Sequence, residues 1–397
     1  MATLSAATPA LRPASATEIA AMVIDAAAAG NSLDAIGGGT RSGLGRPMSG
    51  APAMSLAGLS GITLYEPAEL VIGARAGTSV AEIERTLAGR GQMLPFEPMD
   101  HRALYGTGGE PSIGGVFAGN ISGPRRISAG AARDHLLGVT LVNGRGQIVR
   151  SGGRVMKNVT GLDLVKLNCG AMGTLGILSE VILKVLPAPE FTATLAFEGL
   201  AVADAVGLMS RAMGSPFEIA AAAHLPGRSG SPARTLLRLE GFETAVRHRL
   251  GALAERLDVS APRSILEAGA STALWAGIRD VTALEAPADA EIWRVGVAPA
   301  KAPQIVAGIA GLPCFLDWAG GLIWIAAPAD AGLETTLRPA VGALSGHATL
   351  VRAGEARRRE VPVYQPLAAP LMSLTRGLKQ SFDPHRIINP GRMYEGI

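Results

Sequence analysis

Glycines standing in runs are the residues of this chain best suited to chemistry. The first run, GGGT at 37–40, directly follows a short apolar segment and continues as RSGLG at 41–45. Because glycine has no Cβ, successive backbone N–H groups in such a run can converge on a diphosphate, and the hydroxyl of Thr40 can add a donor. Taken alone, the run is equally typical of an ordinary turn, so its interpretation depends on the elements around it.

Two common nucleotide-binding motifs are excluded for this run. Ser42 stands where the third glycine of G-x-G-x-x-G would be, and no clear helix follows, so the run is not a Rossmann fingerprint. It is not a Walker A loop either, because no Gly-Lys-Ser/Thr follows. A dinucleotide bound here must therefore lie in another fold.

Three further elements are rich in small residues. They are PSIGGVFAGN at 111–120 with ISG at 121–123, GAARD at 130–134, and KNVTGLDL at 157–164 with GTLGI at 173–177. The density of small residues in 111–123 indicates a backbone that lies against a flat or charged ligand. Helix packing through Gly115 and Gly119 is the alternative, but it leaves Ser112 and Asn120 without a role.

The elements that must position these runs can be read from caps and periodicity. Capping boxes at 15–18 and 79–82 predict two helices, which end at Gly30 and Gly89. Short apolar segments predict strands at 33–36 and 68–76, and alternating apolar residues predict a strand at 176–185 and a hairpin at 136–150. The stretch 103–130 lacks periodicity, and we expect an irregular segment with a functional use there.

The texture of the chain changes at Pro187-Ala-Pro189, where we predict a domain boundary. Beyond it, Ala-rich helical segments alternate with short strands, and β–α–β patterns on both sides of about residue 290 allow a ferredoxin-like fold. The predicted division is therefore 1–187 for the first domain, 188–371 for an α+β cap, and 372–397 for a segment that returns to the first domain. The helical segments are 201–213, 242–257 and 268–284, and the strands are 235–240 and 322–326.

Composition excludes several classes of protein. The chain has 397 residues, a net charge of only +3 and no strongly basic stripe, so we expect no nucleic-acid partner. Two distant cysteines, Cys169 and Cys314, exclude a disulfide framework and a four-cysteine metal or iron–sulfur site. No signal peptide and no run of about 18 apolar residues is found, so we expect a cytoplasmic protein that contacts a membrane only through partners.

In their order, the four glycine-rich elements resemble the FAD domain of the vanillyl-alcohol-oxidase family. The resemblance covers about residues 10–187 and the tail NPGR at 389–392. It implies an α+β fold class, with a PCMH-type FAD-binding domain of two α/β subdomains plus a ferredoxin-like α+β cap. KNVTGLDL and the tail are typical of the glycolate oxidase and D-lactate dehydrogenase branch, and the chain is most similar to glycolate oxidase FAD-binding subunits.

The resemblance also implies which residues contact FAD. The diphosphate contacts would come from Gly37, Gly38, Gly39, Thr40, Gly43 and Gly45. The flavin and ribityl side would be lined by Pro111, Ser112, Gly114, Gly115, Gly119, Asn120 and Ser122. Adenine and ribose would be covered by Gly173, Gly176 and Ile177. Arg41 and Ser42 stand where covalent members have their flavin-linked His, so FAD is expected to be noncovalent.

The function implied by the resemblance is that of one subunit in a glycolate oxidase complex. Glycolate or a similar 2-hydroxy acid would be oxidised to glyoxylate, and electrons would pass from the flavin to an iron–sulfur subunit. A larger flavin subunit would complete the complex, which could be peripheral at the inner membrane. The cap lacks the His pair of metal-dependent members, so no metal is expected. Two alternatives stay open: a non-catalytic assembly subunit, and a stand-alone FAD-dependent 2-hydroxy-acid or sugar oxidase.

No catalytic residue is assigned from the sequence. A 2-hydroxy acid needs a cation for its carboxylate and a base for its hydroxyl proton, and 125–126 (Arg-Arg) is the better candidate for anion contact. His135 is favoured as a structural residue, and His101 as part of a surface loop. The arginines at 357–359 are read as a solvated helix face, and the tryptophans as core or interface residues.

Overall fold

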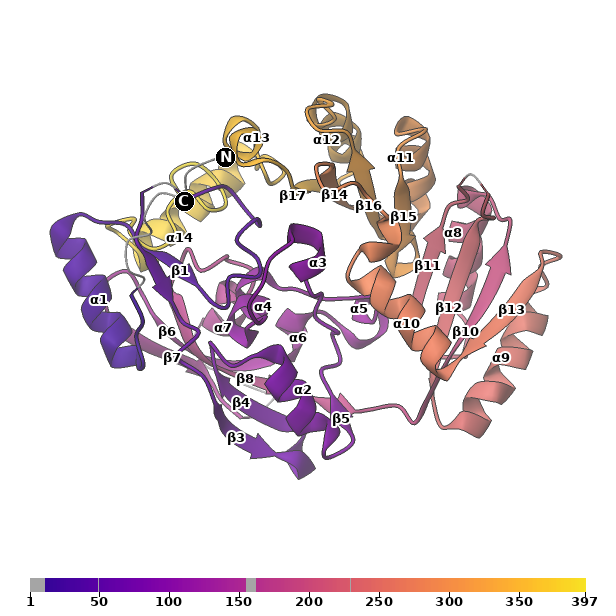
Figure 1. Ribbon diagram of the computed structural model, residues 1–397, viewed down its shortest axis with the longest axis horizontal. Coiled ribbons are helices and arrows are strands. Elements are labelled where there is room, and N and C mark those ends of the chain that lie inside the picture. Colours follow the sequence, from indigo (N-terminus) through magenta and orange to yellow (C-terminus); the bar gives the residue numbers. More distant parts are fainter. Residues whose placement is uncertain (1–10, 49, 155–161, 229) are drawn as a thin grey trace.

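The computed structural model describes residues 11–48, 50–154, 162–228 and 230–397, which form two lobes side by side (Figure 1). Helix α1 (Ala16–Ala29) opens the first lobe. The Ser15 hydroxyl accepts a hydrogen bond from Glu18 N at 3.1 Å, and Gly30 ends the helix with φ +66°. Strand β1 (Asp34–Ile36) then pairs in parallel with β2 (Ala53–Ser55) and runs directly into Gly37. The predicted order of helix, strand and glycine loop is confirmed.

A 5-stranded antiparallel sheet forms the centre of the first lobe, in the order β3-β4-β8-β6-β7. Its strands are β3 (Ile62–Glu66), β4 (Val71–Arg75), β6 (Leu136–Val142), β7 (Ile148–Gly152) and β8 (Ile177–Lys184). The strand predicted from residue 68 starts later, because a 3-10 turn occupies Pro67–Glu69. Helix α2 (Val80–Ala88) is capped by Ser79 as predicted and buries Ile83 and Leu87 in the same core.

The stretch 103–130, expected to be irregular, contains most of three short helices. These are α3 (Arg102–Tyr105), α4 (Ile113–Gly119) and α5 (Arg126–Ala129). Ser112 caps α4, and the helix buries Ile113, Val116 and Phe117 at helical spacing. The expectation was wrong here because the glycines lower helix propensity, whereas burial of these three side chains stabilises the helix in place.

The cap is an 8-stranded antiparallel sheet made of two halves with the same topology. Each half runs β-α-β-β-α-β with its first strand beside its last, which is the ferredoxin-like arrangement. The halves join through β11 and β15, where His224 pairs with Leu316. The first half comprises β10 (Phe191–Glu198), α8 (Val202–Met213), β11 (Ala221–Leu225), β12 (Arg234–Gly241), α9 (Glu243–Leu257) and β13 (Arg263–Glu267). The second comprises β14 (Glu291–Gly296), α11 (Ala302–Gly308), β15 (Cys314–Asp317), β16 (Leu322–Ala327), α12 (Glu334–Ala343) and β17 (His347–Arg352).

The two faces of the cap sheet are covered differently. Helices α8, α9, α11 and α12 pack on the outer face, where Val206, Leu250 and Leu337 join the core. The inner face meets α10 (Ala268–Arg279) and the first lobe, so that Trp275 and Trp324 share a cluster with Leu44 and Met99. A cleft between the lobes is therefore bordered by residues from both.

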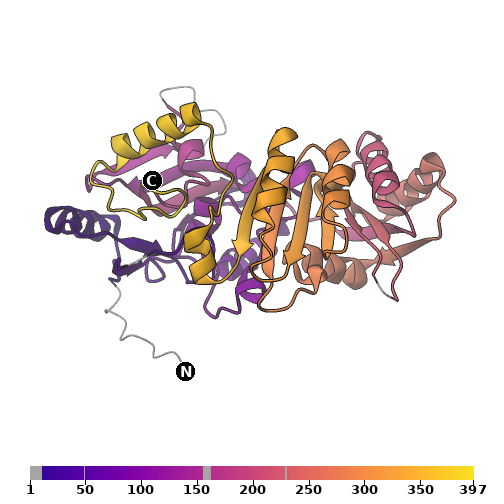
Figure 2. The same ribbon diagram turned by 90° about the horizontal axis from the view of Figure 1, so that it is seen from above.

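The end of the chain returns to the first lobe. Helix α13 (Glu355–Glu360) is followed by α14 (Ala369–Phe382), which lies along the first lobe in Figure 2. Beyond it, Asn389 N donates to Leu33 O at 2.9 Å. The division into domains at 187 and 371 stays a prediction. None of the helices that the structure describes is long and apolar enough to cross a membrane.

Candidate cofactor and substrate site

The loop after β1 presents backbone N–H groups that have no acceptor. Within the described residues, none of the N–H groups from Gly37 to Arg41 donates a hydrogen bond. The loop is held against 109–112 so closely that a Cβ on Gly38 would lie 1.8 Å from Glu110 O. Adjacent N–H groups without acceptors are costly unless an external group satisfies them, and such concave backbone is typical of an anion site. This observation fits the diphosphate of FAD.

Three cavities in the cleft share lining residues and together form one trough. The first, of about 110 Å³, lies on the loop 37–42. It shares Ser112, Gly115 and Asn389 with a second cavity of about 60 Å³. At its other end it shares Leu44, Gly119 and Met172 with a third cavity of about 320 Å³, which reaches the cap. The trough therefore runs from the start of β8 to the inner face of the cap sheet.

Most of the residues predicted to contact FAD line this trough. They are Gly37, Gly38, Gly39, Thr40, Ser112, Gly114, Gly115, Gly119, Asn120, Ser122, Gly173, Gly176 and Ile177. Three others support the loop from outside: Gly43 packs on Tyr105, Gly45 adjoins Arg392, and Pro111 O accepts from Val80 N at 2.8 Å. Of the KNVTGLDL run, 157–161 lies outside the described residues.

Asn389 from the tail ties the two sides of the trough together. Its Oδ1 accepts a hydrogen bond from Ala35 N at 2.8 Å, and its Nδ2 donates to Met172 O at 2.9 Å. The tail therefore contributes a lining residue to the trough wall. Whether these residues contact FAD stays a prediction.

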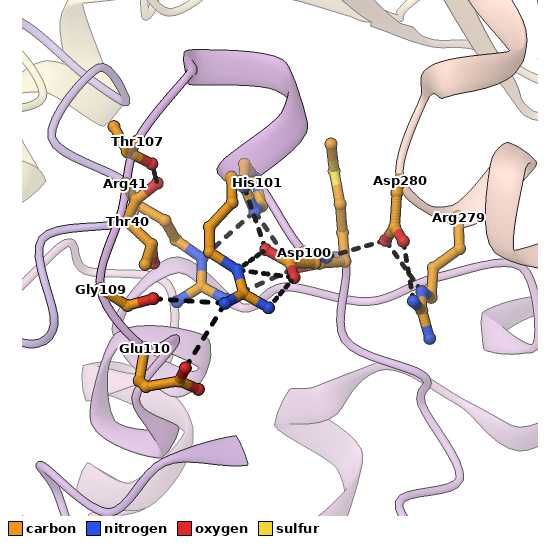
Figure 3. Close-up of polar contacts among 11 residues, drawn as sticks. Thr40, Arg41, Asp100, His101, Thr107, Gly109, Glu110, Arg279 and Asp280 are labelled. Atoms are coloured by element: carbon orange, nitrogen blue, oxygen red, sulfur yellow. Dashed lines mark hydrogen bonds and ion pairs between the residues drawn. The ribbon is translucent and has the colours of Figure 1, made fainter. Parts of the chain in front are cut away.

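The partly buried Arg41 and the buried His101 form a pair beside the glycine loop (Figure 3). Arg41 Nε donates to His101 Nδ1 at 3.2 Å, and burial lowers the pKa of Arg41 to about 10, so the guanidinium stays charged. Burial, with the charge of Arg41, lowers the pKa of His101 to about 3. The same Nδ1 also lies 3.2 Å from Met99 O, so both contacts converge on one ring nitrogen. The expectation of a surface loop at His101 was wrong.

A polar network fixes this part of the loop to the cap (Figure 3). The Asp100 carboxylate accepts from Arg102 Nη2 at 2.7 Å, and Arg102 Nη1 donates to Gly109 O at 3.3 Å. Asp100 N in turn donates to Asp280 Oδ1 at 2.9 Å, just beyond the end of α10. The segment that presses on Gly38 is thereby held from both lobes.

The third cavity is cationic. Arg126 from α5 and Arg294 from β14 both line it, and within the described residues neither forms an ion pair or a side-chain hydrogen bond. Burial lowers the pKa of both guanidiniums, to about 10 for Arg294, so both remain charged at neutral pH. Of the adjacent arginines proposed from the sequence, Arg126 therefore faces the cavity, whereas Arg125 pairs with Glu240.

Two further polar side chains of this cavity were missed in the sequence. Partial burial and the nearby guanidiniums lower the pKa of His347, which leaves its imidazole neutral at pH 7. Tyr364 has a buried hydroxyl without a hydrogen-bond partner among the described residues, and burial raises its pKa. No local motif marks either residue, because they are brought here by β17 and the segment after α13. His135, by contrast, does not line the trough, and its Nε2 lies 2.7 Å from Ala129 O.

Comparison with known proteins agrees with this geometry. An FAD binding domain family matches residues 8–152. Glycolate oxidase subunit GlcE of Escherichia coli K12 is 33% identical over 362 residues, which cover 90% of this chain and 91% of the relative. Glycolate oxidase subunit GlcD of Bacillus subtilis 168 is 30% identical over 38% of this chain and 30% of its own length.

The fold is shared more widely than the sequence. A structure of alkyldihydroxyacetonephosphate synthase matches with a TM-score of 0.68 over 96% of this chain and 75% of that chain, at 15% identity. The predicted fold class and the FAD cofactor are confirmed by these comparisons. The chain belongs to the family of glycolate oxidase subunit GlcE of Escherichia coli, to which it is similar over nearly its whole length, and it carries an FAD-binding domain of the PCMH type.

Proposed function

We propose that the chain is the FAD-binding subunit of a glycolate oxidase complex and that it oxidises glycolate to glyoxylate. The observation that supports this most is the continuity of the trough. A glycine loop leads directly into a cavity with two guanidiniums, and within the described residues neither the N–H groups of 37–41 nor these guanidiniums have a hydrogen-bond or ion-pair partner. One end suits a diphosphate and the other a small organic anion, as a flavin enzyme for hydroxy acids requires.

The chain's own residues would hold FAD noncovalently. The N–H groups of 37–41 would bind the diphosphate, and the small residues of 112–122 would leave room for the flat ring system. The residues Gly173, Gly176 and Ile177 would cover the adenine side. When bound, FAD supplies the two-electron acceptor for the reaction.

The cavity residues would bind and deprotonate the substrate. Oxidation of glycolate to glyoxylate removes a hydride from carbon and a proton from the hydroxyl group. The guanidiniums would neutralise the carboxylate, and His347, neutral at pH 7 and at the edge of the cavity, would accept the hydroxyl proton. His101 is less suited to this task, since its Nδ1 already accepts from Arg41.

The electrons would leave through partner subunits. The similarity to GlcE along nearly the whole chain, and to GlcD over the shared part, supports a place beside a larger flavin subunit and an iron–sulfur subunit. Any contact with the inner membrane would then be made by the complex. A non-catalytic assembly role is the alternative that the following experiment separates from this proposal.

The test starts from the chain purified alone. Its visible spectrum is recorded, the protein is denatured, and the released chromophore is separated from the polypeptide. Released flavin, followed by bleaching of the folded protein on anaerobic addition of glycolate, is the expected result. A yellow protein that glycolate does not bleach, alone or with its partner subunits, would favour the assembly role. A folded colourless protein that takes up no added FAD would refute the cofactor assignment.

A further inference from the structure

We infer that Arg126, Trp318 and Arg294 form a preformed clamp for the carboxylate of a short-chain organic acid, with Trp318 as the spacer that sets the two guanidiniums. This inference rests on the proposed function, since it names the part of the cavity that binds the acid. Both guanidiniums lie over the same indole ring, with Cζ–centroid distances of 4.5 Å for Arg126 and 4.9 Å for Arg294. Their charges are therefore within about 10 Å of each other by this geometry.

The guanidiniums of Arg126 and Arg294 carry like charges and repel each other, so their arrangement is unfavourable unless an anion is bound. Burial and the charge of Arg126 lower the pKa of Arg294, and the nearby carboxyl of Asp317 offsets only part of this effect. The described residues offer no carboxylate within ion-pair distance of either one and no acceptor for their side-chain N–H groups. Because both line the cavity, an anion that enters it would relieve the repulsion and satisfy the donors.

The spacer is itself fixed on three sides. Trp318 Nε1 donates to Gly123 O at 3.0 Å, and Trp318 N donates to Asp317 Oδ1 at 2.7 Å. Its backbone and that of Ala319 are left-handed, with φ of +52° and +55°, which costs about 1 kcal/mol or more for a residue other than glycine. The surrounding contacts thus impose one orientation on the indole, and with it one spacing on the guanidiniums.

The position of the clamp indicates what it binds. Guanidinium groups match a carboxylate by donating two parallel hydrogen bonds. The remaining walls of the third cavity include His347, Thr349 and Trp324, and its volume of about 320 Å³ accommodates a short acid. Arg126 belongs to the first lobe and Arg294 to the cap, so a bound carboxylate would also link the two lobes.

The experiment measures anion binding rather than turnover. Oxalate is the probe, since it is a two-carbon carboxylate without a hydrogen that can be removed. It is titrated into the FAD-loaded chain, and separately into the chain stripped of FAD, with tryptophan fluorescence and calorimetry as readouts. The variants are Arg126→Gln, Arg294→Gln, Trp318→Leu and Trp318→Phe. Arg256→Gln, on the exposed surface of α9, removes one positive charge far from the cavity and is the matched control.

Each Arg→Gln variant should lose about 10- to 100-fold in oxalate affinity, as expected for hydrogen bonds between charged groups. Trp318→Leu should lose about tenfold, whereas Trp318→Phe should recover most of the affinity because an aromatic face remains. The control should bind oxalate like the wild type. A purely structural role for Trp318 would not distinguish Phe from Leu at equal stability.

Two results would overturn the clamp. One is wild-type oxalate affinity in both arginine variants, and the other is absence of oxalate binding to the wild-type chain with or without FAD. Flavin content is measured on every sample from its visible absorbance. A chain that binds oxalate but takes up no FAD would contradict the proposed flavin function and leave the clamp standing, so the two failures are distinguishable.

Discussion

Replacement of Gly38 by alanine tests whether close backbone contact shapes the FAD site. The new Cβ would lie 1.8 Å from Glu110 O, whereas ordinary contacts start at 3.4 Å, so the loop must move by about 1.5 Å. The opposing segment cannot yield easily, because Arg102 and Asp280 hold it through Gly109 and Asp100. Overpacking of this kind costs about 1–3 kcal/mol. If the loop relaxes in the free protein and must return to its original shape to bind FAD, this cost corresponds to about 5- to 150-fold weaker FAD binding.

The assay is a titration of the flavin-free chain with FAD, followed by quenching of flavin fluorescence. Gly108→Ala is the matched control, because it lies in the same segment and its Cβ would meet no atom within 4 Å. Urea unfolding of both variants separates loss of binding from loss of fold. If Gly38→Ala binds FAD as tightly as Gly108→Ala, the loop does not form the diphosphate site, and the reasoning from its N–H groups fails.

Three further predictions concern stability. Lys379→Met should lower the free energy of unfolding by about 3–5 kcal/mol, because the fully buried carboxylate of Asp383, 2.8 Å from Lys379 Nζ, loses its counter-charge. The measurement is the shift of the urea midpoint, with an unchanged dependence of the free energy of unfolding on urea concentration. Ser15→Ala should cost about 1 kcal/mol through loss of the cap of α1, and unchanged thermal unfolding would contradict that. Burial raises the pKa of Asp317 from 3.8 to about 7, so the native state binds more protons than the unfolded state between these values. The free energy of unfolding should therefore fall as pH rises through this window, and Asp317→Asn should make the fall less steep. The measurement is the free energy of unfolding of both proteins from about pH 5 to about pH 8. Equal dependence on pH in the two proteins would show that Asp317 does not titrate there.

Local signals predicted the parts of the fold that local chemistry determines. Ser15 and Ser79 cap their helices as the capping boxes indicated, and the hairpin of β6 and β7 follows the alternation of its apolar residues. The helix α4 was missed, since three of its seven residues are glycines and its stability comes mainly from burial against β8 and its neighbours, with Ser112 as its cap. In α4, the low helix propensity of the glycines opposes the helix that tertiary packing stabilises, and the same glycines supply the small residues that line the trough.

The site was predictable only where its residues are consecutive. The glycine runs that form the floor of the trough could be recognised, because the loop 37–42 and the segment 111–122 each carry several lining residues. Arg294, His347 and Tyr364 could not, since they are distant in the sequence. The pairing of β14 with β17 brings the first two together, and the segment after α13 brings Tyr364.

The arginines at 357–359 were predicted to form a solvated helix face, and this interpretation was wrong for two of them. Arg357 pairs with Glu291 at 2.8 Å, and Arg358 donates to Gly45 O at 2.9 Å, so two of these side chains are structural rather than solvated. The sequence lacked the signal for this, because the partners stand 66 and 313 positions away.

The neighbouring residues Arg125 and Arg126 have different roles: Arg125 anchors α5 to the cap, and Arg126 lines the cavity. Arg125 forms an ion pair with Glu240 of the cap, and Ser128 Oγ donates to Ala220 O at 2.7 Å, so α5 is anchored to the cap on one side. Beside them, Glu97 accepts from Arg238 at 2.8 Å, which adds a second buried ion pair across the same boundary. Because breaking a buried pair costs several kcal/mol, these contacts fix α5 against the cap. Arg126, which forms no ion pair within the part of the chain that the structure describes, is thereby held beside Trp318. The ion pairs at the lobe boundary therefore hold the guanidinium of Arg126 in the cavity, and the position of the proposed carboxylate site follows from them.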